Sequence, residues 1–243
     1  MPAGHRVNRL LAALPAMQRA RFAADCLPVQ LVHGEVLHEP GDRVRNVYFP
    51  TGCVVSTVIV IDGHCSLETG MIGSEGMWGY ASILGDSAAF PLRVAVKDGG
   101  AAWCMKSATF RRHLRDLPAL RPLLDRYLRV LLCQLAQTAA CMRFHVVEER
   151  LARWLLMTQD RTQSNTFRVT QEFLAFVLGV RRVGVTVAAG ILQSRQLIRY
   201  KRGLVTIIDR ERLAAAACSC YGSDIETYRR ELTSAAPAQR DSR

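Results

Sequence analysis

Between residues 29 and 104 the hydrophobic positions form short runs that are interrupted by turn residues. Turns such as Glu39-Pro40-Gly41-Asp42 and Asp98-Gly99-Gly100 separate runs rich in β-branched residues, and Val54–Ile61 is the clearest of these runs. Short strands at a regular spacing of roughly ten residues are typical of an antiparallel barrel, jelly roll or sandwich. The sequence therefore predicts a compact antiparallel β-domain here.

The hydrophobic spacing becomes helical from residue 107 onwards. Ser107 is a suitable N-cap for a short helix to about Arg115. Pro118 suits the first turn of a second helix that continues to about Arg143, because the N–H group that proline lacks has no partner at that position. We therefore expect one short helix followed by one long helix.

The long helix carries a stripe of leucines at alternating steps of four and three residues, as in a coiled-coil seam. The stripe consists of Leu124, Leu128, Leu131 and Leu135. A long helix between two domains has few intramolecular surfaces that could cover so broad an apolar face. We expect the stripe to form the interface of a homodimer, and the alternative is a core helix of a monomer.

Residues 170–192 have the pattern of a helix-turn-helix. Thr170 can cap a short helix that includes Gln171, and Gly179 can supply the turn to a second helix that starts near Arg181. The first exposed turn of such a second helix meets base edges in the major groove of DNA. On this helix the candidate DNA-contacting residues are Arg181, Arg182, Val183, Gly184 and Thr186.

Two β-rich runs around a basic glycine turn follow the second helix. They predict a hairpin wing with Lys201 and Arg202 at its tip, where side chains commonly contact phosphates. The net charge of the chain is +11, and residues 161–212 hold ten basic and three acidic residues, a net of +7. This local excess suits a polyanion such as double-stranded DNA.

With these motifs the chain resembles the Crp/Fnr family of bacterial regulators over nearly its whole length. The resemblance rests on Glu39-Pro40-Gly41-Asp42, on Val47-Tyr48-Phe49, on residues 147–156 and on residues 170–192. It implies a cyclic-nucleotide-binding-like β-roll, a dimer helix, a winged helix-turn-helix that reads a palindromic site, and RNA polymerase as a partner. By the same resemblance Arg182 occupies the position that commonly reads guanine, and Val183 replaces a glutamate that often follows it.

The expected fold class is α+β, with an antiparallel, jelly-roll-like β-roll, a long dimerisation helix and a C-terminal winged helix-turn-helix. The expected divisions are an N-terminal helical segment (1–28), the sensor β-roll (29–115), the dimerisation helix (116–144), the DNA-binding domain (145–213) and a C-terminal tail (214–243). Residues 1–6 and 233–243 have the composition of loose ends.

The sensory half departs further from the family pattern. Where members that bind cyclic AMP carry a Gly-Glu-Leu segment and an Arg-Ser pair, this chain has Gly79-Tyr80-Ala81-Ser82 and Phe90-Pro91, with Arg93 nearby but out of register. A cyclic phosphate needs a buried cation or a cluster of N–H donors. We therefore take Gly79, Tyr80, Ser82 and Arg93 as the candidate effector pocket, and expect no cofactor and no ordinary cyclic-nucleotide binding.

The eight cysteines do not indicate a metal site, because none of their spacings is a CxxC pair. Cys218-Ser219-Cys220 is the one close pair, and His113 and His145 have no ligand spacing relative to it. Reduced thiols and no bound metal are expected.

The sequence thus predicts a homodimeric, sequence-specific DNA-binding regulator. The alternative is a ligand-binding module that acts through protein partners, with the helix-turn-helix as a packing unit only. An enzyme is not expected, because no paired carboxylates, nucleophile elbow or phosphate-binding glycine loop occurs at a suitable spacing. Without an apolar run of about 20 residues or a signal peptide, we expect a cytoplasmic location and no membrane partner.

Overall fold

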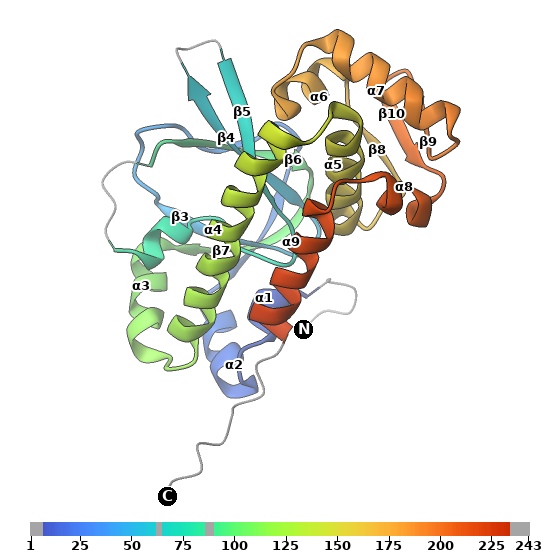
Figure 1. The fold of residues 1–243 in the computed structure, drawn as a ribbon. Coiled ribbons are helices and arrows are strands. Elements are labelled where there is room, and N and C mark those ends of the chain that lie inside the picture. The colour runs from blue at the N-terminus through green and yellow to red at the C-terminus, as the bar shows by residue number, and fades with distance from the viewer. Residues whose placement is uncertain (1–6, 62–64, 86–89, 234–243) are drawn as a thin grey trace, which may run out of the picture.

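The computed structural model describes residues 7–61, 65–85 and 90–233 (Figure 1). A β-roll in the N-terminal half is joined by a long helix to a smaller helical domain in the C-terminal half. The mixed helical and antiparallel architecture confirms the expected fold class. Of the ends at 1–6 and 233–243 that we expected to be loose, residues 1–6 and 234–243 lie outside the described residues, whereas Thr233 ends a π-helical turn.

The roll consists of two antiparallel sheets that pack face to face. One sheet has the order β1-β7-β3, formed by Leu27–Leu31, Gly100–Lys106 and Asn46–Pro50. The other has the order β2-β6-β4-β5, formed by Val36–His38, Leu92–Asp98, Val54–Ile61 and Cys65–Ile72. Leu31 and Ala102 of the first sheet pack in one cluster with Val96 of the second. The predicted strand Val54–Ile61 is confirmed with the same bounds.

Short helices close one end of the roll: α1 (Arg9–Ala12), α2 (Ala16–Ala24), the 3-10 turn Tyr80–Ile83 and α3 (Ser107–Asp116). Their core brings Phe22 edge-on to Phe49, with ring centroids 5.3 Å apart. The prediction of Ser107 as an N-cap is wrong by one residue. Lys106 holds the cap position, and the buried Ser107 hydroxyl has no hydrogen-bond partner among the described residues.

The long helix α4 (Leu120–Phe144) runs along the roll, and one of its faces is buried against the protein. Leu123, Tyr127 and Val130 are buried on this face. The Tyr127 hydroxyl accepts a hydrogen bond from the Met77 backbone N–H (3.1 Å) and donates one to its carbonyl oxygen (3.2 Å). These contacts fix the N-terminal third of α4 to the roll.

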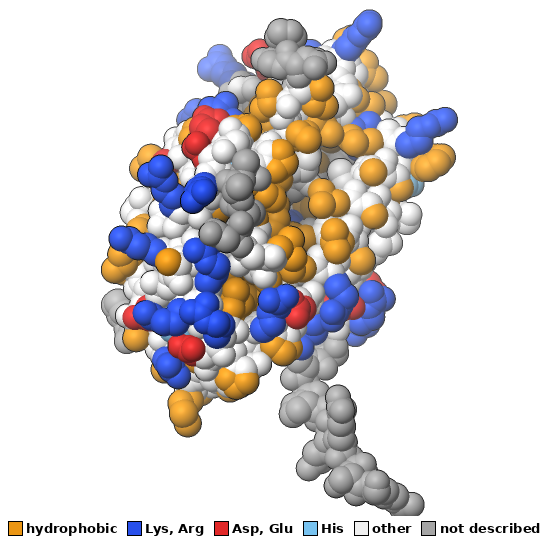
Figure 2. Space-filling view, turned by 90° about the vertical axis from the view of Figure 1, so that its left-hand side faces the viewer, with side chains coloured by type: hydrophobic (Ala, Val, Ile, Leu, Met, Phe, Trp, Pro, Cys, Tyr) orange, Lys and Arg blue, Asp and Glu red, His pale blue; other side chains and the backbone are white. Residues whose placement is uncertain are grey.

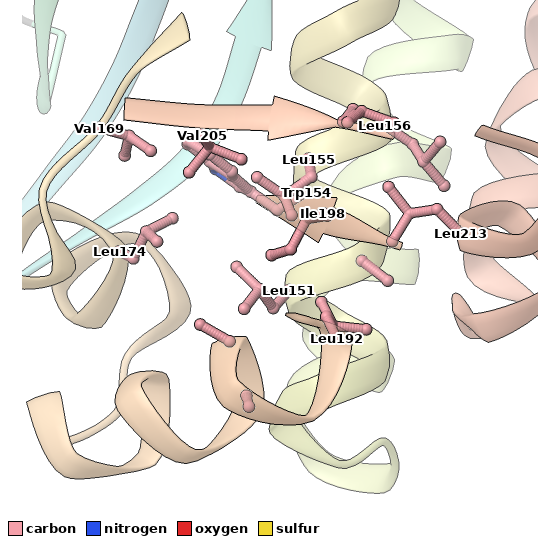
Figure 3. Close-up of a cluster of buried hydrophobic side chains, with 14 of the residues drawn as sticks. Leu151, Trp154, Leu155, Leu156, Val169, Leu174, Leu192, Ile198, Val205 and Leu213 are labelled. Atoms are coloured by element: carbon pink, nitrogen blue, oxygen red, sulfur yellow. The ribbon is translucent and has the colours of Figure 1, made fainter. Parts of the chain in front are cut away.

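The C-terminal domain begins with α5 (Val147–Thr162) after a two-residue break. It continues with β8 (Thr166–Arg168), α6 (Gln171–Leu178), α7 (Arg182–Ser194), β9 (Ile198–Lys201), β10 (Leu204–Ile207) and α8 (Arg210–Ala216). Side chains from these helices and strands meet in one apolar core, which includes Leu151 of α5, Leu174 of α6, Leu192 of α7 and Val205 of β10 (Figure 3). This core orients α6 and α7.

Residues 214–243, which we expected to form a tail, include the helix α9 (Cys220–Tyr228) and a following π-helical turn (Arg229–Thr233). The helix α9 packs along α4, as Figure 1 shows. The sequence stretch offered no clear apolar stripe, because the buried positions of α9 include the charged Asp224 beside Cys220 and Tyr221. The C-terminal segment therefore returns the chain to the long helix.

Buried polar contacts join the two domains across β5 and α5. The Trp154 indole donates a hydrogen bond to Glu68 (2.8 Å), and the Lys97 ammonium lies 3.7 Å from the centre of the Trp154 ring system. Burial lowers the pKa of Lys97 to about 8, although the nearby Glu68 carboxylate opposes this shift. Among the described residues no single helix is long and apolar enough to cross a membrane, and α6 and α7 pass such a test only as a bent pair.

Candidate DNA-binding surface

The two helices α6 and α7 meet at an angle of 105°. The Thr170 hydroxyl accepts a hydrogen bond from the Phe173 N–H (3.0 Å), which confirms Thr170 as the N-cap of α6. Gly179 ends α6 with a φ of +60°, a left-handed conformation that costs glycine little. Gln171 accepts a hydrogen bond from the Thr186 hydroxyl (3.0 Å) and so links the outer ends of the two helices.

The helix α7 has a buried face and an exposed face. Val185, Ala188 and Leu192 are buried in the core of the domain. The side chains of Arg182, Val183 and Thr186 are exposed. A Cβ added at Gly184 would meet no atom closer than 4.0 Å, so this position leaves open space on the helix surface. Arg181 takes the N-cap position one residue before the helix begins, and it is exposed as well.

Val187 also belongs to the exposed face, and the sequence analysis did not include it. It is 57% exposed, and Val183, one turn earlier, is 65% exposed. Val187 follows Val183 by four residues and so lies on the same face of the helix, and this spacing is the sequence signal that could have identified it. Two adjacent exposed valines form a small apolar strip beside Arg182, a shape that suits contact with thymine methyl groups.

The wing is a tight hairpin that is fixed to α7. Arg202 and Gly203 form the two-residue turn with positive φ angles of 51° and 73°, the combination that a type I′ hairpin turn requires. The Gln193 side-chain oxygen accepts a hydrogen bond from the Tyr200 N–H (2.8 Å), and the Tyr200 hydroxyl donates to the Val169 carbonyl (2.8 Å). The wing tip is therefore held in a fixed position relative to α7.

Six cations of this domain are exposed and form no ion pair with any described residue. They are Arg168, Arg181, Arg182, Arg199, Lys201 and Arg202. Other cations of the domain are neutralised, as Arg195 is by Glu148 (2.7 Å) and Arg210 by Asp160 (2.7 Å). Unpaired cations on the wing and at the start of α7 produce a positive field there, which attracts phosphates.

The leucines of the predicted dimer seam do not all lie on one surface. Leu124 is fully buried in the core of its own chain, and Leu128 and Leu131 pack partly against that core. Leu135 is 46% exposed, and Leu132, which widens the stripe, is 65% exposed. Leu124 is therefore a core residue, and the exposed apolar surface is displaced towards the C-terminal half of α4.

The four residues of the candidate effector pocket do not line a common cavity. Tyr80 stacks edge-on against Trp78 and Phe90 within the roll, and Gly79 adopts a φ of +92° where an added Cβ would lie 2.7 Å from Val47 Cγ1. Arg93 alternates with buried neighbours on β6, points out of the roll and lies 3.4 Å from Glu39.

Ser82 faces a cavity that the other three residues do not line. It lines a separate cavity of about 300 Å³ together with Arg43, Arg45 and Lys106. A further cavity of about 520 Å³ lies between α4, α5 and α9, with Arg161 and Asp224 in its wall. These two cavities thus lie away from the aromatic interior of the roll.

A helix-turn-helix with a rigid hairpin wing, free cations at both contact points and a β-roll attached through a long helix defines a DNA-binding regulator. Residues 149–216 match the model of the Crp-like helix-turn-helix domain. No curated protein matches the sequence. The domain that matches contains α5 to α8, and therefore every residue of the predicted reading helix and wing.

Solved structures extend the likeness to the whole fold. The c-di-GMP-responsive global regulator CLP of Xanthomonas campestris is 19% identical, with a TM-score of 0.65 over 79% of this chain and 99% of its own. A protein of Eubacterium rectale described as a Crp/Fnr-family regulator is 17% identical, with a TM-score of 0.67 over 85% and 96%. FixK2 of Bradyrhizobium japonicum is 12% identical, with a TM-score of 0.67 over 79% and 98%.

At these identities the solved structures show a shared fold, and the match of residues 149–216 shows the class of the DNA-binding domain. Residues 149–216 therefore form a Crp-like helix-turn-helix domain of a DNA-binding transcription regulator, and the chain as a whole has the fold of Crp/Fnr-type regulators, as the resemblance drawn from the motifs predicted. This class is one of regulators and not of enzymes. The alternative of a helix-turn-helix that serves as packing only is not favoured.

Proposed function

We propose that the protein regulates transcription as a homodimer that binds an inverted repeat in double-stranded DNA. The helix α7 enters the major groove, and the wing contacts the adjacent backbone. The observation that carries this proposal is the set of six exposed, unpaired cations on the wing, on the neighbouring strands and at the start of α7. A protein that binds chromosomal DNA acts in the cytoplasm, with RNA polymerase as the expected partner.

In this proposal the residues of α7 divide into reading and positioning roles. Arg182 makes a bidentate pair with guanine, and Val183 with Val187 contacts thymine methyl groups. Arg181 and Thr186 contact the backbone at the groove edges, where Gly184 permits a close approach. Thr170 and Gln171 lie at the start of α6, which crosses the backbone in this type of domain. The exposure of these side chains supports the assignment.

The proposed dimer uses the exposed part of α4. Besides Leu132 and Leu135, Met142 is 36% exposed on the same side of the helix. Figure 2 shows hydrophobic side chains gathered in a band down one face of the molecule, with Lys and Arg around it. An exposed apolar band of this kind is typical of an interface between protein subunits. The twofold axis would present two copies of α7 to successive major grooves.

The proposed effector is not a cyclic nucleotide held through its phosphate inside the roll. CLP is described as c-di-GMP-responsive, and another protein with this fold carries a cyclic-AMP-binding description, so the fold suits such ligands in those proteins. Here the rings of His38, Trp78, Tyr80 and Phe90 contact one another, and Arg93 points outwards. Calorimetry with cyclic AMP and c-di-GMP should give no binding heat. Saturable binding of either nucleotide would contradict this part of the proposal.

The test of DNA binding is the salt dependence of affinity for a duplex selected from a random library. Neutralising phosphates releases counterions, so log affinity should fall linearly with log salt concentration. Lys201→Ala with Arg202→Ala should lower affinity for all duplexes alike and reduce the slope by about two. Arg229→Ala, which removes an exposed arginine paired with Glu226 on α9, should leave the slope unchanged. If no sequence is enriched in the selection, the proposal fails.

A further inference from the structure

The fold brings together four residues whose spacing in the sequence predicts no metal site. Cys141 and His145 lie at the C-terminal end of α4, and Cys218 and Cys220 lie where α9 begins. Their Sγ and imidazole nitrogen atoms all lie within 4.8 Å of one another. Because 77 positions separate Cys141 from Cys218, no local spacing could reveal the cluster.

The distances between these atoms fit a tetrahedron around one ion. The Sγ atoms of Cys141 and Cys218 are 3.5 Å apart, and so are Cys220 Sγ and His145 Nδ1. With Zn–S bonds of about 2.3 Å and Zn–N bonds of about 2.0–2.1 Å, tetrahedral coordination requires about 3.8 Å between two sulfurs and about 3.5 Å between sulfur and nitrogen. These two distances need changes of at most a few tenths of an ångström, and the remaining pairs of ligand atoms lie within 4.8 Å of one another.

Two other uses of the thiols fit the geometry less well. A disulfide needs a sulfur–sulfur distance of about 2.05 Å, far below the observed distance. An iron–sulfur cluster spreads its ligands over several irons, whereas all four ligand atoms here lie within 4.8 Å. A purely apolar cysteine core would not require an imidazole nitrogen in contact with a thiol. A single ion accounts for all four residues.

The surroundings suit a closed site with a net negative charge. All three cysteines are buried and His145 is partly buried, so the protein supplies every ligand and leaves no open position, as in a structural zinc site. Three thiolates and one Zn²⁺ would carry a net charge of −1. Arg150 and Arg153 line a small cavity together with Cys141; Arg153 is paired with Asp224 (2.6 Å), so Arg150 is the cation that can balance that charge.

The Gln137 amide supports the site from outside the ligand set. Its Nε2 group lies 2.8 Å from Cys220 Sγ and donates a hydrogen bond to it. Donors of this kind orient metal-bound thiolates and are part of the site's design.

We propose that Cys141, His145, Cys218 and Cys220 bind one Zn²⁺ ion. Two ligands come from the end of α4 and two from the segment after α8, so the ion ties both ends of the DNA-binding domain to the long helix. The ion would therefore hold together the two ends of the segment that contains α5 to α8. The expected consequence is a fixed hinge at residues 145 and 146 and a higher thermal stability of the whole chain.

The first experiment is elemental analysis of the full-length protein, isolated under reducing conditions. Wild type and Cys133→Ser should contain one zinc per chain, since Cys133 is an exposed cysteine on α4 outside the cluster. Cys141→Ser and Cys218→Ser should lose the metal. His145→Phe should lose it as well, whereas His145→Cys should retain it, because four thiolates also bind zinc. Equal zinc content in wild type and Cys141→Ser would overturn the proposal.

The second experiment uses wild type alone, so that it does not depend on the folding of any variant. Chelation should lower Tm, and added Zn²⁺ should restore it at one equivalent per chain. Added Co²⁺ should give the intense charge-transfer absorption of cobalt bound to several thiolates. The absence of any saturable effect of Zn²⁺ on Tm, or an unforced Cys141–Cys218 disulfide in the isolated protein, would refute the site. Neither readout depends on DNA binding.

Discussion

The dimer interface proposed on α4 is tested by Leu132→Asp combined with Leu135→Asp. Both side chains are exposed in the single chain, with 65% and 46% of their surface accessible, so the substitution should leave the fold of the protomer intact. In the dimer each carboxylate would enter an apolar seam, and an unpaired charge there is costly. The variant should therefore be a folded monomer.

The size of the effect can be estimated from the exposed surface. Full burial of a leucine contributes about 1.5–3 kcal/mol, and the two copies of each leucine would bury about half of a side chain each, so their loss costs about 3–6 kcal/mol. This corresponds to an increase of roughly 10²–10⁴ in the dissociation constant of the dimer. The repulsion between the new carboxylates adds to this value.

Sedimentation equilibrium measures the dissociation constant, and circular dichroism with a thermal scan checks the fold. Ile208→Asp provides a matched control, because Ile208 is 50% exposed but lies outside α4. The control should remain dimeric. If the double variant also remains dimeric at the same concentration, the interface lies elsewhere and the exposed leucines have another role.

Further predictions concern the contacts between the domains. Because burial lowers the pKa of Lys97 from its usual value of 10.5 to about 8, the unfolded chain binds the proton more tightly, and stability should rise with pH between about 8 and 10.5. Lys97→Met should remove this rise in the free energy of unfolding, which amounts to about 3 kcal/mol, whereas the control Lys106→Met at an exposed lysine should keep it. Denaturant unfolding at each pH measures the effect. Parallel plots of unfolding free energy against pH for wild type and Lys97→Met would contradict the reasoning. Arg161 and Glu75 form a buried ion pair (2.8 Å), so Arg161→Met should lower the free energy of unfolding by about 3–5 kcal/mol. Adding Glu75→Gln should recover much of this loss. If the effects of the two substitutions are additive in the double variant, the pair is not coupled.

The DNA-binding half could be predicted from the sequence because its signals are local. A cap at Thr170, a glycine at 179 and a hairpin turn at 202 and 203 each determine the backbone within a few residues. The family model confirms the class of the domain. The expected start of the second helix near Arg181 holds as well, because Arg181 is the N-cap of α7.

Features that depend on the tertiary arrangement could not be predicted. The leucine repeat on α4 continues through core and surface alike, so the repeat alone cannot tell that Leu124 is buried and Leu135 exposed. The candidate effector residues are close in sequence, but strand alternation turns Arg93 away from Tyr80. The cysteine cluster depends on the return of α9 to α4, which no periodicity indicated.

The central claim is that Arg182 on α7 reads a base of an inverted repeat, and binding-site selection with wild type and Arg182→Ala tests it most directly. Wild type should enrich two half-sites whose centres are about 34–36 Å apart, with guanine at one fixed position in each. Arg182→Ala should lose about 1–3 kcal/mol of affinity and the preference at that position alone. An unchanged preference at every position would show that α7 does not read the sequence through Arg182, and would contradict the account.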